Sequence, residues 1–107
     1  MLFRSAKVKA KVRKILADMG AYQFMPATHG YGKSGVPDIV GCYKGAFFAI
    51  ECKAGKGKTT ALQERELNLI RYAGGVSFVV NEENIGEVER TIILHADRLV
   101  RLSNSEL

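Results

Sequence analysis

Two apolar segments on either side of a Lys44-Gly45 turn constrain the fold of this chain more than any other feature. Together they span about Val36 to Lys53, and both are rich in β-branched and aromatic residues. Such runs around a two-residue turn are typical of a β-hairpin. In that hairpin Tyr43 pairs with Ala46, and every earlier residue pairs with a later one in turn. The pattern therefore predicts the strands and their register.

Three charged residues, Asp38, Glu51 and Lys53, interrupt this apolar hairpin. Counting back from the turn places Asp38 directly opposite Glu51 on the same face of the sheet, with Cβ atoms about 5 Å apart. Lys53 shares that face because it lies two residues beyond Glu51. Two carboxylates this close repel each other unless a cation lies between them. Because oxygen ligands suit Mg2+ or Mn2+, the register predicts a metal site.

Charge is distributed unevenly along the chain. Residues 1–58 contain 11 Lys or Arg and 3 Asp or Glu, a balance of +8, whereas residues 59–107 contain 5 and 8, a balance of −3. A basic half around a carboxylate pair fits a phosphodiester substrate, because backbone phosphates supply most of the non-specific affinity for DNA. A solvated basic surface is the alternative explanation.

The bulk properties indicate one globular domain covering residues 1–107. An apolar fraction of 47% and a charged fraction of 25% are ordinary for a soluble protein. No apolar run approaches the ~20 residues of a membrane-spanning helix, and the start of the chain turns basic where a signal peptide is apolar. We therefore expect a cytoplasmic protein without a membrane partner.

The two cysteines, Cys42 and Cys52, are offset in the predicted register. We therefore expect small buried hydrophobic residues rather than a disulfide. A zinc site would need more ligands than these cysteines and the distant His29 and His95 offer.

The remaining chain predicts an α/β fold with a mixed sheet and the element order helix, strand, strand, strand, helix, strand, helix (α-β-β-β-α-β-α). A helical crossover joins the Glu51 strand to the next one, so these two strands should run parallel. A glycine-rich loop covers Thr28 to Gly35, and beyond Asp97 we expect a short strand or tail. The other predicted elements are a helix over Phe3–Met19, a strand over Tyr22–Ala27, a helix from a Thr59 or Thr60 cap to about Ala73, a strand over Val76–Val80 and a helix over Asn84–His95.

The charged residues of the hairpin resemble the signature of the PD-(D/E)XK nucleases in its Glu-X-Lys form. Pro37 precedes Asp38, Glu51 follows thirteen residues later, and Lys53 comes after one more residue. The longer context, with Gly35-Val36 before the motif and Gln63 to Leu67 opening a helix, is similar to the virus-type replication-repair nuclease (VRR-NUC) domain in its stand-alone form. The resemblance covers roughly residues 5 to 95.

This resemblance implies a restriction-endonuclease-like fold and an endonuclease that depends on Mg2+ or Mn2+ and prefers branched or structured DNA. Stand-alone members of the group are similar to phage-encoded homodimers that resemble Holliday junction resolvases. The resemblance therefore also implies a homodimer that acts in a bacterium or a phage-infected host cell. Carried onto this chain, the resemblance makes Asp38, Glu51 and the Cys52 backbone carbonyl the metal ligands. Lys53 then positions or polarises the attacking water, and Gln63 supports the site from its helix.

One departure from the family concerns the first helix. Many relatives carry there a glutamate that points toward the metals, whereas the stretch from Ser5 to Lys11 has no acid and Lys9 stands near that position. We therefore expect a single-metal site, or one with a weaker affinity for a second metal.

Basic residues on the first helix and in two loops are candidates for binding DNA phosphates, and Tyr31 is a candidate for stacking on an unpaired base. The basic residues concerned are Lys7, Lys11, Lys14, Lys33, Lys56 and Lys58.

Other functions fit the sequence less well. The segment from Cys52 to Thr59 superficially resembles a phosphate-binding P-loop, but that pattern requires glycine where Cys52 stands, so we expect no nucleotide cofactor. A sequence-specific restriction enzyme is disfavoured because 107 residues leave little room for base-reading insertions. The main alternative from another class is a non-catalytic DNA-binding module that keeps the nuclease fold.

Overall fold

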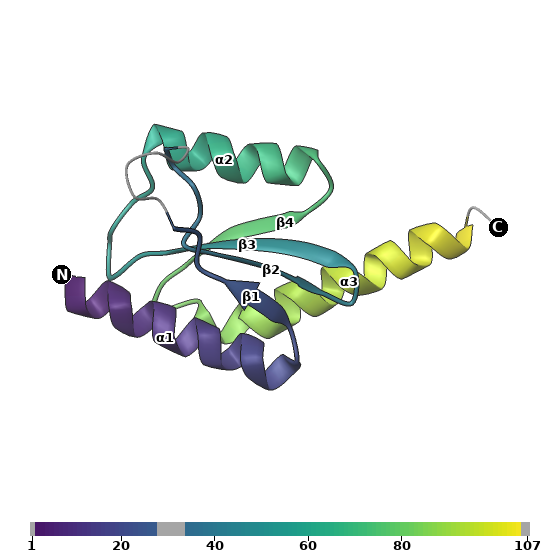
Figure 1. Cartoon of the computed structure of the whole chain (residues 1–107), viewed down its shortest axis with the longest axis horizontal. Coiled ribbons are helices and arrows are strands. Elements are labelled where there is room, and N and C mark those ends of the chain that lie inside the picture. Colours follow the sequence, from purple (N-terminus) through teal and green to yellow (C-terminus); the bar gives the residue numbers. More distant parts are fainter. Residues whose placement is uncertain (1, 28–33, 106–107) are drawn as a thin grey trace.

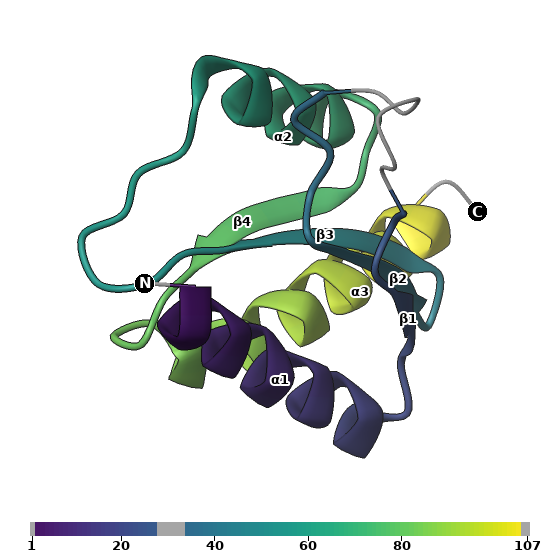
Figure 2. The ribbon, with the colours of Figure 1, turned by 60° about the vertical axis from the view of Figure 1, so that its left-hand side comes forward.

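A mixed four-stranded sheet forms the centre of the computed structural model, which describes residues 2–27 and 34–105 (Figure 1). The strands, in the spatial order β1-β2-β3-β4, are Tyr22–Phe24, Ile39–Tyr43, Ala46–Cys52 and Val76–Val80. Helix α2 (Ala61–Tyr72) lies on one face of the sheet, and α1 (Leu2–Met19) and α3 (Val88–Ser105) lie on the other (Figure 2). The predicted α/β class and element order are confirmed.

The central hairpin has the predicted register. Tyr43 pairs with Ala46, and the pairing continues to Ile39 and Ile50. Lys44 and Gly45 have φ values of 48° and 86°, which is the left-handed pair of conformations that a tight hairpin turn requires. Strand β1 pairs antiparallel with β2, and β4 pairs parallel with β3, as expected from the helical crossover between them.

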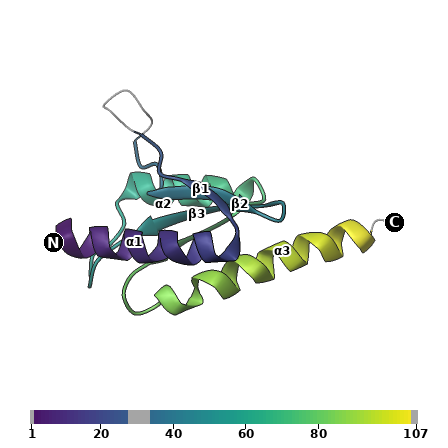
Figure 3. The same cartoon turned by 60° about the horizontal axis from the view of Figure 1, so that its bottom comes forward.

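The main core lies between the sheet and helices α1 and α3, which run side by side beneath it (Figure 3). Alternation along β3 decides which residues enter this core, because successive side chains of a strand point to opposite faces. Ile50 and Cys52 point into this core. Glu51 lies between them on the strand and therefore points to the opposite face, toward α2. The buried members of the core are Val8, Val12, Leu16, Ile39, Phe48, Ile50, Cys52, Val80, Val88 and Ile92.

The C-terminal helix is longer than predicted. A short 3-10 turn at Ile85–Glu87 leads into α3, which continues without a break to Ser105. The expectation of a short strand or tail beyond Asp97 is therefore wrong. Residues 97–105 contain neither glycine nor proline, so nothing in the sequence interrupts the helix. In Figure 1 this yellow end of α3 extends past the sheet.

Two smaller expectations are also wrong. Strand β1 ends at Phe24 rather than Ala27, because Pro26 has no N–H to contribute to a ladder. Cys42 is exposed rather than buried, since it lies on the sheet face that α2 leaves open near β1, whereas Cys52 is buried as expected. Both cysteines are free thiols.

Candidate active site

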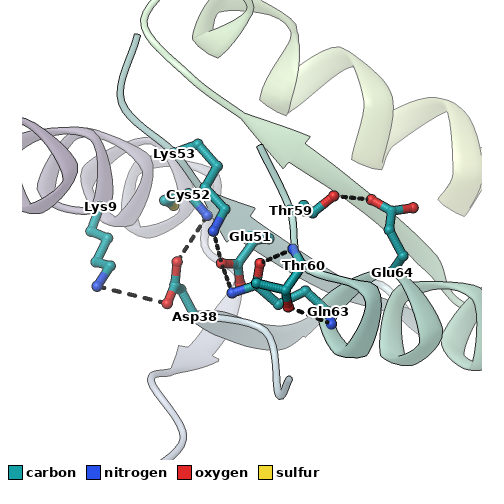
Figure 4. Close-up of polar contacts among 9 residues, drawn as sticks. All are labelled: Lys9, Asp38, Glu51, Cys52, Lys53, Thr59, Thr60, Gln63 and Glu64. Atoms are coloured by element: carbon teal, nitrogen blue, oxygen red, sulfur yellow. Dashed lines mark hydrogen bonds and ion pairs between the residues drawn. The ribbon is translucent and has the colours of Figure 1, made fainter. Parts of the chain in front are cut away.

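The hairpin register brings Asp38 and Glu51 together at the open end of the β2–β3 pair (Figure 4). Asp38 lies one residue before β2, beyond the last pair of the ladder, which joins Ile39 to Ile50. Its Oδ2 atom accepts a hydrogen bond of 2.9 Å from the backbone N–H of Cys52. The carboxylate of Asp38 is thereby fixed to the strand that carries Glu51.

The two carboxylate oxygens of Glu51 differ in their contacts. Its side chain is only 3% exposed, and Oε2 lies 2.8 Å from Gln63 Nε2 and 3.3 Å from Lys53 Nζ. The second oxygen, Oε1, is buried and has no hydrogen-bond partner among the described residues. A buried carboxylate oxygen without a partner is costly, so this atom marks the position where a cation would be most stabilising.

The pKa of Glu51 also indicates that a cation would be stabilising at this position. Burial raises the pKa of Glu51 above its ordinary value of 4.5, and the neighbouring Asp38 charge raises the pKa further. Lys53 acts in the opposite direction through its hydrogen bond and its charge. The raised pKa means that Glu51 in its ionised form lacks enough positive charge nearby, which a divalent metal ion would supply.

Helix α2 positions Gln63 through a capping box. The Thr60 Oγ1 accepts the Gln63 backbone N–H at 3.2 Å, while Gln63 Oε1 accepts the Thr60 backbone N–H at 2.9 Å. The amide oxygen of Gln63 is thus fixed by the helix start, and its Nε2 is left to donate to Glu51. The helix cap and the site share one side chain.

Gly35 sets how closely α2 approaches the hairpin. Its φ is +81°, and a Cβ atom at this position would lie 2.5 Å from the backbone carbon and oxygen of Leu62 and 2.9 Å from the Gln63 nitrogen. Only glycine allows this contact between the segment before β2 and the first turn of α2. The contact therefore fixes the distance between Gln63 and the strand that carries Glu51.

The carboxylates line a pocket of about 460 Å³ between the N-terminal half of α1, the hairpin and the start of α2. Two of its cationic side chains come from α1, namely Arg4 and Lys9. Lys9 Nζ lies 3.7 Å from Asp38 Oδ1, so this lysine reaches the carboxylate pair from the first helix. The residues that line the pocket are Arg4, Ser5, Lys9, Asp38, Glu51, Cys52, Lys53, Ala54 and Gln63.

The donor set fits one hard divalent ion. The described residues contain no group of three or more His, Cys, Asp or Glu side chains that could hold a metal, so the side-chain ligands would be Asp38 and Glu51 alone. Mg2+ typically uses one or two carboxylates and completes its shell with water and substrate phosphate. The Cys52 carbonyl is a suitable third ligand, because the N–H of the same strand residue already points at Asp38.

The Cys52 thiol has no part in such a site. Burial in the core, together with the charges of Asp38 and Glu51, raises its pKa to about 12. The thiol therefore stays protonated, and a protonated thiol is not a metal ligand.

The basic loop from Ala54 to Lys58 is attached to α1 through Glu82. Arg4 binds Glu82 Oε2 with its Nη2 at 2.8 Å, and Glu82 Oε1 accepts the Gly55 N–H at 2.7 Å. This network lies at the rim of the pocket, since Arg4 also lines it. Lys56 and Lys58 are exposed in the same loop.

The predicted DNA-binding residues are distributed over several surfaces. Lys7 and Lys11 line a second hollow of about 260 Å³, which shares Arg4 with the first. Lys14 forms an exposed ion pair with Asp18 at 3.0 Å. Tyr31 and Lys33 lie outside the described residues, so their part in DNA binding stays a prediction.

Sequence reasoning missed Arg4, Ser5 and Thr60 as contributors to the site. The threonine had a readable signal, because Thr60 followed three residues later by Gln63 matches the capping-box pattern. Arg4 and Ser5 had no such sequence signal, because their position at the pocket depends on how α1 packs across the sheet.

Comparisons with known proteins agree with this architecture. Residues 4–95 match the family described as archaeal Holliday junction resolvase (Hjc). A solved VRR_NUC domain is similar with a TM-score of 0.68 and 23% identity, covering 83% of this chain and 94% of its own. A solved VRR_NUC domain protein has a TM-score of 0.67 and 18% identity, with coverages of 85% and 89%.

A Holliday junction resolvase structure from Archaeoglobus fulgidus has a TM-score of 0.49 and 24% identity, covering 66% of this chain and 63% of its own. Among curated proteins there is no match.

Proposed function

Because this chain belongs to the archaeal Holliday junction resolvase family, we propose that its pocket hydrolyses phosphodiester bonds of branched DNA with the help of a divalent metal ion. Family membership makes the chain a structure-selective nuclease that acts on DNA. The observation that carries the metal dependence is the buried, unpartnered Oε1 atom of Glu51 opposite Asp38. A site that leaves such an atom open is suited to a hard cation, for which we propose Mg2+ or Mn2+.

Asp38, Glu51 and the Cys52 carbonyl would hold the ion. When bound, it would lower the pKa of a coordinated water and neutralise charge on the phosphate. Glu51 keeps its orientation through Gln63, and Asp38 keeps its orientation through the Cys52 N–H. Both carboxylates are therefore preorganised, which reduces the reorganisation needed in the transition state.

Lys53 is the residue that we assign to the attacking water. It lies two residues after Glu51, on the same face and just beyond the end of β3. Its side chain is 19% exposed, and its Nζ atom lies 3.3 Å from Glu51 Oε2. From this position it can donate a hydrogen bond to a water at the pocket and hold it in line with the scissile bond. Its positive charge also stabilises the charge that develops on the phosphate.

Branched DNA and a homodimer are the finer parts of the proposal. Two cuts on opposite arms of a four-way junction need two active sites, and a symmetric pair of chains supplies them most simply. A monomeric mass in light scattering, with and without junction DNA, would count against the dimer.

A panel of labelled DNA substrates tests the function. We expect cutting of four-way junction, fork or flap DNA in Mg2+ or Mn2+ and none in EDTA, with linear duplex as the comparison. Glu51→Gln should abolish cutting and leave junction binding nearly intact, while Glu89→Gln, an exposed residue of α3, serves as the matched control. If no substrate is cut in either metal but binding persists, the chain is a non-catalytic DNA-binding module.

A further inference from the structure

The first helix brings a cation to the carboxylate pair and no acid. Lys9 Nζ lies 3.7 Å from Asp38 Oδ1 (Figure 4). Lys9 lines the pocket together with Arg4 and Ser5 of the same helix. The Lys9 side chain is 35% exposed, so it is partly withdrawn from solvent. Between Leu2 and Ala17 the helix has no Asp or Glu.

Each oxygen of Asp38 already has one partner. Oδ2 accepts the Cys52 N–H, and Oδ1, the outer atom, faces the Lys9 ammonium. In two-metal sites the ions lie only about 3.5–4 Å apart, so a second ion would lie close to the same carboxylate pair. A second ion that shared Asp38 would have to approach Oδ1 and would meet the positive charge of Lys9 there.

The charge balance of the pocket also disfavours a second divalent ion. The lining side chains contribute two negative charges, from Asp38 and Glu51, and three positive charges, from Arg4, Lys9 and Lys53. Arg4 is partly neutralised by Glu82, but Lys9 and Lys53 have the two active-site carboxylates as their partners. One divalent ion can bind at Glu51 Oε1, and among the described residues that line the pocket no other side chain has a buried oxygen without a hydrogen-bond partner.

We propose that Lys9 is a built-in cation that takes the place of a second metal ion and limits this site to one divalent ion per chain. Lys9 is a positioning residue for the metal ligands, since it acts through Asp38. The inference rests on the proposed function. It differs from an ordinary surface ion pair in one measurable respect, because the identity of residue 9 then sets how many ions bind.

Counting bound Mn2+ tests this directly. In a titration followed by the electron paramagnetic resonance signal of free Mn2+, we expect one ion per chain for the wild type. Lys9→Glu should bind two, because it supplies the missing carboxylate beside Asp38. Lys9→Met, which removes the charge and keeps the length, should bind one ion at least several-fold more tightly. Lys44→Glu makes the same charge change as Lys9→Glu, but at the far end of the hairpin, and should behave as the wild type.

Each outcome has a distinct meaning. Two ions bound to the wild type, or unchanged stoichiometry and affinity in both Lys9 variants, would overturn the role of Lys9 and leave the proposed function intact. An equal gain in affinity for Lys44→Glu would overturn it too, since the effect would then be general electrostatics. If the wild type bound no Mn2+ at all, the proposed metal-dependent function itself would be contradicted. Should Lys9→Glu fail to fold, Lys9→Met alone decides.

Discussion

Gln63 Nε2 donates a hydrogen bond of 2.8 Å to Glu51 Oε2, and this one bond joins the start of α2 to the acid in the centre of the sheet. The bond leaves Oε1 as the free atom of the carboxylate. The other end of the Gln63 amide is used to cap the helix, so the orientation of Glu51 depends on a local helical motif.

Replacing Gln63 by alanine should lower the cleavage rate by about 10- to 100-fold, the usual effect of losing a partner of a metal ligand. The reason is that Glu51 loses the group that orients Oε2. Thr60→Ala is the matched comparison, because it removes the hydroxyl of the capping box but leaves the Gln63 amide. It should cost about 1 kcal/mol of unfolding free energy and change the rate much less. Single-turnover cleavage and thermal unfolding measure the two effects, and equal rates for both variants would contradict this assignment.

Gly35→Ala should destabilise the protein by about 2 kcal/mol or more, because the added Cβ meets the backbone of Leu62. Gly45→Ala separates steric overlap from backbone strain. Gly45 also has a positive φ, of 86°, but nothing lies within 4 Å of an added Cβ there. We expect Gly45→Ala to cost about 1 kcal/mol, the strain of a left-handed residue alone. Urea unfolding of both variants gives the comparison, and similar losses would show that the contact with α2 is unimportant.

The raised pKa of Glu51 predicts the direction of a pH effect on the metal-free protein. The folded state binds the Glu51 proton more tightly than the unfolded chain does. The stability that protonated Glu51 contributes is therefore fully present below the ordinary pKa of 4.5. It is lost as the pH rises through the raised pKa. Glu51→Gln should therefore gain stability relative to the wild type as the pH rises above 4.5 in EDTA. Thermal unfolding over a pH series measures this difference, and a constant difference would contradict it.

Adding Mg2+ should stabilise the wild type against unfolding, and this effect should increase with pH, opposite to the trend without metal. The metal binds the ionised carboxylate, so the stabilisation by Mg2+ should grow as Glu51 loses its proton. The Glu51→Gln variant should show little of this stabilisation at any pH.

Glu82→Gln should strengthen binding to four-way junction DNA. The exposed Glu82 carboxylate occupies Arg4 and the N–H of Gly55 at the rim of the pocket, and its loss frees Arg4 for a phosphate. One added phosphate contact steepens the plot of log affinity against log salt by about 0.9. Glu83→Gln removes the same charge one residue along and controls for net charge. Fluorescence anisotropy in EDTA over a salt series makes the measurement, and identical slopes for the two variants would refute the role of Glu82.

The sequence was sufficient for those parts of the site that depend on local rules. A two-residue turn and strand alternation fix the register, and the register alone places Asp38, Glu51 and Lys53 together. The capping preference of threonine likewise predicted where α2 begins. These features depend on neighbours close in sequence, so reading them needs no knowledge of packing.

The parts that sequence reasoning missed depend on contacts between distant segments. Arg4 reaches Glu82 across 78 positions of the chain, and its partner could not be read from either neighbourhood. The apolar spacing of Leu62, Leu69 and Tyr72 in α2 also gave no guide to burial, because all three are exposed and Leu67 is the buried apolar residue.

The bond between Asp38 and the Cys52 amide gives the molecule an internal reporter. The carboxylate here stands in for the backbone acceptor that a further ladder pair would have provided, and so closes the open end of the hairpin. Deuterium uptake at the Cys52 amide would measure how often its hydrogen bond to Asp38 opens in the absence of substrate. Slow exchange at this amide would mean that Asp38 is held in place before DNA binds.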